Sequence, residues 1–235
     1  MIPLRDDQPC YSTPFINYFL IILNVLVFLW EFSVGMQSSG TLNGFISEFG
    51  VVPRHTVAVL TGHSYDSLAT AILPFFTSMF LHGGFFHVAG NMLFLWIFGD
   101  NVEDYLGHFR YLLFYLVSGI AAALSQIILN PNSAIPTVGA SGAIAGVMGA
   151  YFILYPKARV LVWFPPIFFF HVPAWLMLGY WFLVQFFMGT ASSIAVTSQT
   201  TGGIAFWAHV GGFVVGVLMI KIFSERPQRH RYGAW

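Results

Sequence analysis

The sequence predicts an all-α membrane protein, a bundle of six transmembrane helices, from its composition, its apolar runs and the placement of its basic residues. Of its 235 residues, 57% are hydrophobic and only 8% are charged, whereas soluble globular domains carry roughly 25% charged residues. So few charges cannot cover a water-exposed surface, and much of the surface must therefore face lipid. The length suits one compact unit, so residues 1–235 are expected to form a single membrane domain.

Charge and cysteine content exclude several classes of protein. The formal net charge is zero, so nothing indicates a nucleic-acid partner. The one cysteine, Cys10, excludes an internal disulfide. Acidic residues in MIPLRDDQPC stand where a signal peptide would be basic. The first apolar run is therefore expected to be a retained span.

Six apolar runs approach the roughly 20 residues that a spanning helix needs. Three prolines (Pro165, Pro166 and Pro173) interrupt the fifth run, so its membrane part is expected to begin near Ile167. The expected spans are residues 14–36, 87–104, 108–129, 139–155, 160–188 and 202–223.

The basic residues orient these spans. Only Arg54, of nine Lys and Arg residues, falls on the outward side. Because basic residues accumulate in cytoplasmic segments, both termini are expected in the cytoplasm, with residues 1–13 as the N-terminus and residues 224–235 as a basic tail. Two termini on one side require an even number of spans. The eight residues on the inner side are Arg5, Arg110, Lys157, Arg159, Lys221, Arg226, Arg229 and Arg231.

A long outward segment, residues 35–86, separates the first two spans and is too apolar for an ordinary solvated loop. Its stretches FISEFGVVP and SLATAILPFFTSMFL are expected to form short helices at the membrane interface. We interpret most of this loop as a structural lid or spacer, partly embedded in the membrane.

Four polar residues on three spans are expected at one level below the outward surface. His87 and Asn91 lie one turn apart on the second span, so they share a helix face. Ser141 begins the fourth span, and His209 lies about seven residues into the sixth, roughly 10 Å deep. Polar side chains within spans are costly, so this common depth indicates a functional site.

Small residues follow both Ser141 and His209. Gly142 and Gly146 line one face of the fourth span, and Gly212 begins a similar face on the sixth. Such faces let two helices approach closely. We therefore expect these spans to pack together and to bring Ser141 within hydrogen-bond reach of His209.

This pair has a chemical meaning. A serine hydroxyl becomes nucleophilic when a neutral imidazole removes its proton. The acidic residues of the second span lie near its inward end, and nothing directs Glu31 at His209, so a Ser–His dyad is expected rather than a triad. His87, Asn91 and the backbone amide of Ser141 are suitable donors to an oxyanion.

The same residues also have structural interpretations. A serine among glycines is usually a packing residue, and an Asn one turn from a His often joins helices. His82 is interpreted as structural or interfacial. The charged residues around the inward turn between the second and third spans are interpreted as an anchor: Asp100, Glu103, Asp104 and Arg110.

These motifs resemble those of the rhomboid family. That family carries a GxSG nucleophile motif, an upstream HxxxN, and a His before a small-residue run on the last core helix. Here the motifs are GASG at 139–142, HVAGN at 87–91 and AHVGG at 208–212. They occur on the expected spans in the family's order, and the resemblance covers nearly the whole chain.

The resemblance implies an intramembrane serine protease that cuts peptide bonds in or beside transmembrane helices of membrane-protein substrates, without a metal or organic cofactor. By position, Ser141 would be the nucleophile and His209 the general base. His87 and Asn91 would stabilise the oxyanion, and Gly139 would form the tight entry to the serine helix. The fifth helix and the loop after it would be the substrate gate.

The resemblance also suggests a location. The chain shows neither a seventh span nor a soluble extension, which suits a minimal prokaryotic form. The expected location is therefore a prokaryotic plasma membrane, with the site opening to the extracytoplasmic side.

Two positions depart from the family's pattern. The first outward loop reads ILPFF at 72–76, where many members have a Trp-Arg pair. Ala145 stands where some members place an aromatic residue against the histidine ring. Another side chain would have to hold His209 if ring stacking matters.

Two other functions remain open. A catalytically silent rhomboid-like protein would bind membrane clients, although such relatives usually lack the serine or the histidine. A transporter or proton channel using His87 and His209 would need polar groups continuing inward. The inner halves of the fourth and sixth spans, GVMGAYFILY and VVGVLMIKIF, offer almost none.

Overall fold

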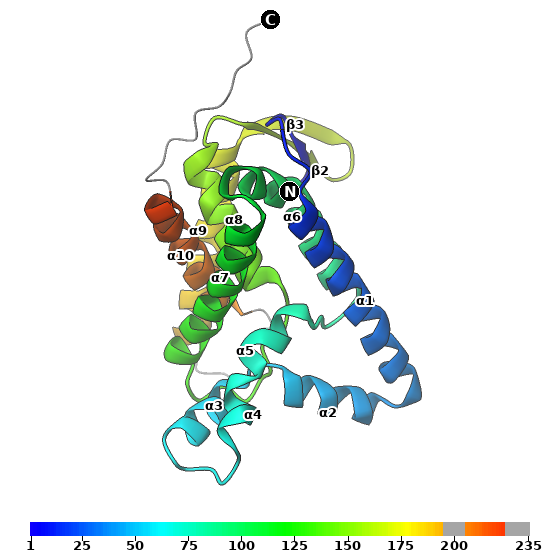
Figure 1. Ribbon diagram of the computed structural model, residues 1–235, viewed down its shortest axis with the longest axis vertical. Coiled ribbons are helices and arrows are strands. Elements are labelled where there is room, and N and C mark those ends of the chain that lie inside the picture. Colours follow the sequence, from blue (N-terminus) through cyan, green and yellow to red (C-terminus); the bar gives the residue numbers. More distant parts are fainter. Residues whose placement is uncertain (195–204, 224–235) are drawn as a thin grey trace, which may run out of the picture.

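The computed structural model describes residues 1–194 and 205–223. They form a helical bundle with a small sheet at one end (Figure 1), which confirms the helical membrane fold. The helices of the bundle are α1 (Phe15–Gln37), α6 (Phe85–Leu106), α7 (His108–Leu129), α8 (Ser141–Leu154), α9 (Ala174–Ile194) and α10 (Phe206–Phe223).

Length and composition decide which helices can cross a bilayer alone. Helices α1, α7, α9 and α10 are long and apolar enough, and the bent pair Leu68–Phe80 with Phe85–Leu106 would make a fifth span. Helix α8 has 14 residues, about 21 Å, against a hydrocarbon core of roughly 30 Å. The described residues therefore carry four or five candidate spans, and the count of six is not confirmed. The buried residue before α8, Ala140, shows that this helix begins inside the bundle.

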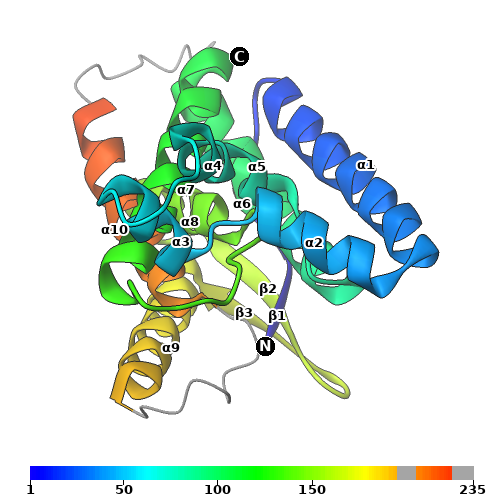
Figure 2. The ribbon, with the colours of Figure 1, turned by 90° about the horizontal axis from the view of Figure 1, so that it is seen from below.

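The outward segment forms short helices, as its apolar stretches predicted. They lie at the end of the bundle opposite the N-terminus, where α2 makes a steep angle with α1 (Figure 1). In the view from this end, the short helices are nearest to the viewer (Figure 2). These helices are α2 (Ser39–Phe49), α3 (Pro53–Leu60), α4 (Leu68–Ile72), α5 (Pro74–Thr77) and the 3-10 turn η1 (Ser78–Phe80).

Backbone hydrogen bonds tie this segment to the chain just before α8. The N–H of Val51 donates to the carbonyl of Thr137 at 3.0 Å, and the N–H of Thr137 returns a bond at 2.8 Å. The N–H of Gly139 donates to the carbonyl of Ser78 at 2.9 Å. The outward segment thus fixes the entry to α8, which agrees with a structural spacer.

A three-stranded antiparallel sheet was not expected from the sequence. Strand β1 (Ile2–Asp6) pairs with β2 (Arg159–Phe164), which pairs with β3 (Phe168–Pro173). The N-terminal residues are therefore partly a strand, and the fifth helix begins at Ala174 rather than near Ile167. The prediction failed because a short apolar run flanked by prolines fits a strand as well as a helix.

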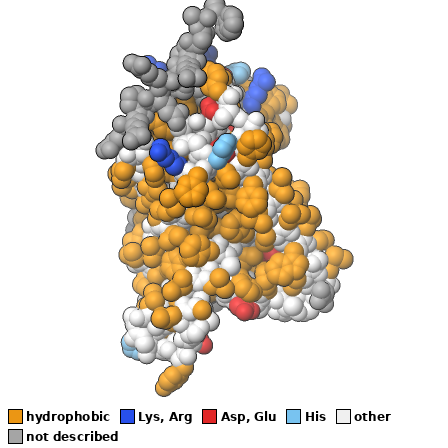
Figure 3. All heavy atoms as spheres, viewed as in Figure 1, with side chains coloured by type: hydrophobic (Ala, Val, Ile, Leu, Met, Phe, Trp, Pro, Cys, Tyr) orange, Lys and Arg blue, Asp and Glu red, His pale blue; other side chains and the backbone are white. Residues whose placement is uncertain are grey.

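The basic residues among the described part of the chain gather mainly at the sheet end. Figure 3 shows charged side chains near this end, above a broad hydrophobic band on the face drawn. We call this end of the molecule the basic end. Residues 202–204 of the expected sixth span, and the expected basic tail at 224–235, lie outside the described residues.

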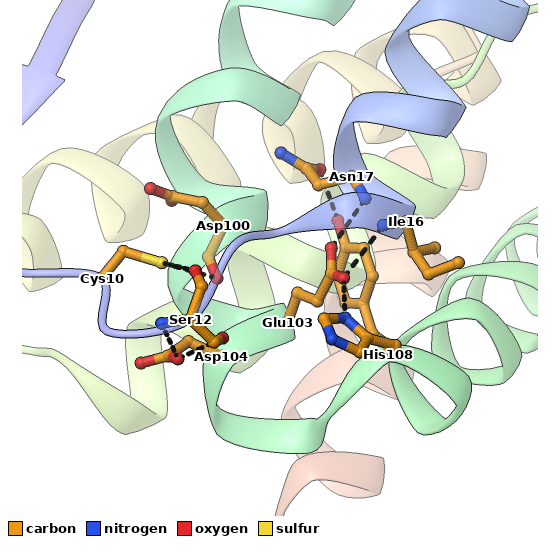
Figure 4. A network of polar contacts seen from close by, with 9 residues as sticks. Cys10, Ser12, Ile16, Asn17, Asp100, Glu103, Asp104 and His108 are labelled. Carbon is orange, nitrogen blue, oxygen red and sulfur yellow. Dashed lines mark hydrogen bonds and ion pairs between the residues drawn. The ribbon is translucent and has the colours of Figure 1, made fainter.

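At the basic end, acidic side chains of α6 hold the start of α1 (Figure 4). The buried carboxylate of Glu103 accepts the backbone N–H groups of Ile16 at 3.0 Å and Asn17 at 2.7 Å, and contacts Nδ1 of His108 at 2.5 Å. Asp104 accepts the N–H of Ser12 at 2.8 Å. Both residues therefore anchor the turn between α6 and α7, but they do so by binding mainly the backbone of α1 and the segment before it.

Candidate active site

Helices α8 and α10 approach each other through their small residues. A Cβ atom added at Gly212 would lie 2.1 Å from the carbonyl oxygen of Gly142, and one at Gly216 would lie 2.0 Å from that of Gly146. Helix α7 also packs closely against α8, because a Cβ at Gly142 would lie 2.6 Å from the Cβ of Ala122. No larger residue fits at these distances, so the predicted packing of the small faces is confirmed.

This packing brings the serine and the histidine together. Ser141 is the first residue of α8, and His209 lies in the first turn of α10. Oγ of Ser141 is 2.7 Å from Nε2 of His209, and both residues are half-buried. His209 lies nearer the start of its helix than the sequence suggested, because α10 begins at Phe206 rather than near residue 202.

Two residues of α9 hold the other side of the imidazole. Nδ1 of His209 is 2.8 Å from Oε1 of Gln185. The ring of Trp181 lies 5.6 Å from the imidazole, centroid to centroid, at 36°. Trp181 therefore provides the aromatic contact that Ala145 cannot. Sequence reasoning missed both residues, although Gln185 is the one amide in the apolar run 174–188 and lies one turn from Trp181.

The turn before Ser141 lies against the expected oxyanion donors. Gly139 has φ +123°, a conformation that favours glycine. A Cβ there would lie 2.8 Å from Nε2 of His87 and 3.5 Å from Nδ2 of Asn91. Helix α8 then begins without a side-chain cap. Because the first backbone N–H groups of a helix have no partner within it, the Ser141 amide is suited to bind an oxyanion.

A chain of contacts supports Asn91 from behind. Its Nδ2 donates to Nε2 of the buried His82 at 2.9 Å. The backbone N–H of His82 donates to Glu31 at 3.0 Å. Glu31 is thus directed at His82 rather than at His209. The interpretation of His82 as structural is compatible with this contact, which links His82 to a residue of the candidate site.

These features define a helical membrane protein in which a Ser–His pair lies between closely packed helices. The family model described as "Rhomboid domain" matches residues 69–226. The chain belongs to the rhomboid family, as its motifs indicated.

Three curated relatives place the chain within this family. Rhomboid protein 1, mitochondrial, of Saccharomyces cerevisiae is 32% identical over 69% of this chain and 45% of that protein. Rhomboid-like protein 11, chloroplastic, of Arabidopsis thaliana is 28% identical over 65% and 53%. Rhomboid protease GluP of Bacillus subtilis is 33% identical over 58% and 24%. The chain thus spans about half or less of the length of these relatives.

These relatives correct the expected location. A prokaryotic plasma membrane was expected because the chain resembles a minimal form. Instead, several similar proteins are mitochondrial or chloroplastic rhomboids, which points to an organellar membrane. The expectation failed because the reactive groups and spans of a rhomboid do not encode which membrane holds it.

Proposed function

We propose that this chain is an intramembrane serine protease that hydrolyses peptide bonds in or next to transmembrane helices of membrane proteins. One observation carries the proposal: Oγ of Ser141 lies 2.7 Å from Nε2 of His209. A base at this distance can take the hydroxyl proton during attack on a carbonyl. A silent client-binding protein would not require this arrangement.

The positions of Ser141 and His209 support the following reaction. Oγ of Ser141 attacks the carbonyl carbon while Nε2 of His209 takes its proton. The resulting oxyanion accepts hydrogen bonds from the Ser141 amide, His87 and Asn91. His209 then gives the proton to the leaving amine, and the ester left on Ser141 is hydrolysed by water with His209 again as the base.

The expected depth of the site below the membrane surface supports this substrate class. A helix hides its carbonyls in its own hydrogen bonds, so a substrate must unwind locally to present one to Ser141. Small residues near the cut and helix breakers beyond it make this unwinding easier. Single-span membrane proteins with such segments are therefore the proposed substrates.

The test uses purified protein and a single-span model substrate. We expect Ser141→Ala and His209→Ala each to lower the cleavage rate by roughly 1,000-fold or more, because serine and base act as a unit. A fluorophosphonate probe should label the wild type and not Ser141→Ala.

Matched controls change the same residue types elsewhere. Ser118 is buried on α7, and its hydroxyl has no partner among the described residues. His63 lies in the outward segment, where its ring contacts Thr61. Ser118→Ala and His63→Ala should keep cleavage within about twofold of the wild type. Cleavage at the wild-type rate by both dyad variants would refute the proposal.

A further inference from the structure

We propose that Gln185 is the positioning residue that fixes the tautomer of His209, taking the place that an acidic residue holds in a triad. This inference rests on the proposed function. It concerns Nδ1 of His209, on the side of the imidazole that faces away from Ser141. The Ser–His reaction alone does not explain what this nitrogen binds.

The direction of each hydrogen bond follows from the atoms involved. The amide oxygen of Gln185, 2.8 Å from Nδ1 of His209, can only accept a hydrogen bond. Nδ1 must therefore carry the proton of the neutral imidazole. The lone pair of Nε2 is then directed at the Ser141 hydroxyl, 2.7 Å away, as a general base requires.

Trp181 and Gln185 act from one face of α9. They are four residues apart, so both lie on the same side of the helix. Trp181 packs against the imidazole at a centroid distance of 5.6 Å, while Gln185 binds its edge. One contact limits tilting of the ring and the other limits its rotation, so together they specify the orientation of the base.

A neutral acceptor suits this place in the protein. Helix α9 is apolar around Gln185, and a carboxylate there would place a charge at membrane depth, beside an imidazole that is neutral before the reaction. An amide oxygen supplies the acceptor without that cost. It stabilises a developing imidazolium less than a carboxylate would, so its main effect is orientation.

The first experiment reads the tautomer directly. Protein labelled with ¹⁵N-histidine gives different nitrogen shifts for the two neutral forms, and His209→Ala assigns the signals. We expect His209 to be protonated at Nδ1 in the wild type and to shift toward the form protonated at Nε2 in Gln185→Met. An unchanged Nδ1–H form in Gln185→Met would overturn the inference.

The second experiment measures cleavage of the single-span substrate. Gln185→Met keeps the length of the side chain and removes the acceptor, so kcat should fall by about 10-fold or more while KM stays unchanged. Gln185→Glu keeps an acceptor and should restore most of kcat. Its negative charge favours the imidazolium, so the acidic limb of its pH–rate profile should move to higher pH.

The control is Leu183→Met, which alters an exposed neighbour on α9 and should leave kcat unchanged. Wild-type kcat in Gln185→Met, or a Gln185→Glu variant as slow as Gln185→Met, would contradict the positioning role. Failure of the proposed function looks different: the wild type itself would neither cleave nor take up the fluorophosphonate. The ¹⁵N spectra would still decide whether Gln185 holds His209.

Discussion

The candidate site and the basic end both contain polar side chains within a largely apolar bundle. The hydrogen-bond partners of these side chains differ between the two regions. At the basic end, Glu103 and Asp104 mainly accept backbone N–H groups of α1 and of the residues before it, and each makes one further side-chain contact, to His108 and to Ser12 respectively. At the site, the bonds join side chains: Ser141 to His209 and His209 to Gln185. Side chain–side chain bonds are a small minority of protein hydrogen bonds.

This difference separates structural from chemical roles. A carboxylate that caps backbone amides satisfies groups that the fold must pair. A serine hydroxyl that is bonded to an imidazole keeps its oxygen available to attack a substrate carbonyl. The imidazole nitrogen can accept the proton that the hydroxyl then loses. The comparison therefore predicts that substitutions at the basic end change stability alone, whereas substitutions of Ser141, His209 and Gln185 mainly change catalysis. Substitutions in the glycine faces that pack α8 against α10 should change both.

The largest effect on stability is expected for Glu103→Ala. This change leaves the N–H groups of Ile16 and Asn17 without their acceptor, which should lower the free energy of unfolding by about 3 kcal/mol. Denaturant titration measures the loss, and kcat of the folded fraction should stay within about twofold. The exposed Glu48→Ala, on α2, is the matched control and should be neutral. A parallel loss of kcat in Glu103→Ala would break the comparison.

The second prediction concerns the close packing of α8 and α10, the helices that carry Ser141 and His209. Gly216→Ala would place a Cβ 2.0 Å from the carbonyl oxygen of Gly146, so it should cost about 2 kcal/mol in the free energy of unfolding. It should also lower kcat, because α8 and α10 separate.

Gly179→Ala on α9 is the matched control. Its Cβ would meet only Phe152 at 3.8 Å, an ordinary contact. The change should leave kcat unchanged and raise stability by up to about 1 kcal/mol, since Ala favours helix. Equal losses in Gly216→Ala and Gly179→Ala would show that α8 and α10 are not the more closely packed pair.

The smallest effect concerns the sheet. Burial raises the pKa of Asp6 above its usual 3.8, although a hydrogen bond from Tyr151 opposes the shift. Because the pKa of Asp6 is higher in the folded than in the unfolded state, protonation of Asp6 adds to the free energy of unfolding. This contribution is fully present below the pKa of the unfolded state and is lost as pH rises through the pKa of the folded state. Unfolding midpoints measured across this window should fall as pH rises in the wild type and stay flat in Asp6→Asn.

Tyr151→Phe sharpens this last test. Without its hydroxyl the pKa of Asp6 should rise further, so the loss of stability should extend to higher pH. The kcat of Asp6→Asn should equal that of the wild type. A change in kcat there would mean that the basic end and the site are coupled.

Short sequence patterns predicted the positions of several helices and which helices pack together. Apolar runs located α1, α6 and α7 within about two residues of their ends. The glycines around Ser141 and His209 predicted which helices pack together, because only small side chains permit such approach. The proximity of Ser141 and His209 followed from these faces.

Features that depend on contacts between distant parts of the chain could not be predicted from the sequence. The apolar run around Pro165 and Pro166 is compatible with the start of a helix and with a β-hairpin. Pairing of β2 with β1, which is far away in the chain, favours the hairpin. Gln185 and Trp181 gave no sign of their role, since the rotation of α9 about its axis decides which residues face His209.

The sequence by itself determined that this is a helical membrane protein of the rhomboid type and which reactive groups it carries. Only the tertiary structure decided how those groups are oriented: Gln185 on Nδ1 of His209, His82 on Asn91, and Gly139 beside His87. Composition and spacing fix what each helix can bury. The contacts of one side chain with another depend on how separate helices are placed together, and no short stretch of sequence encodes that.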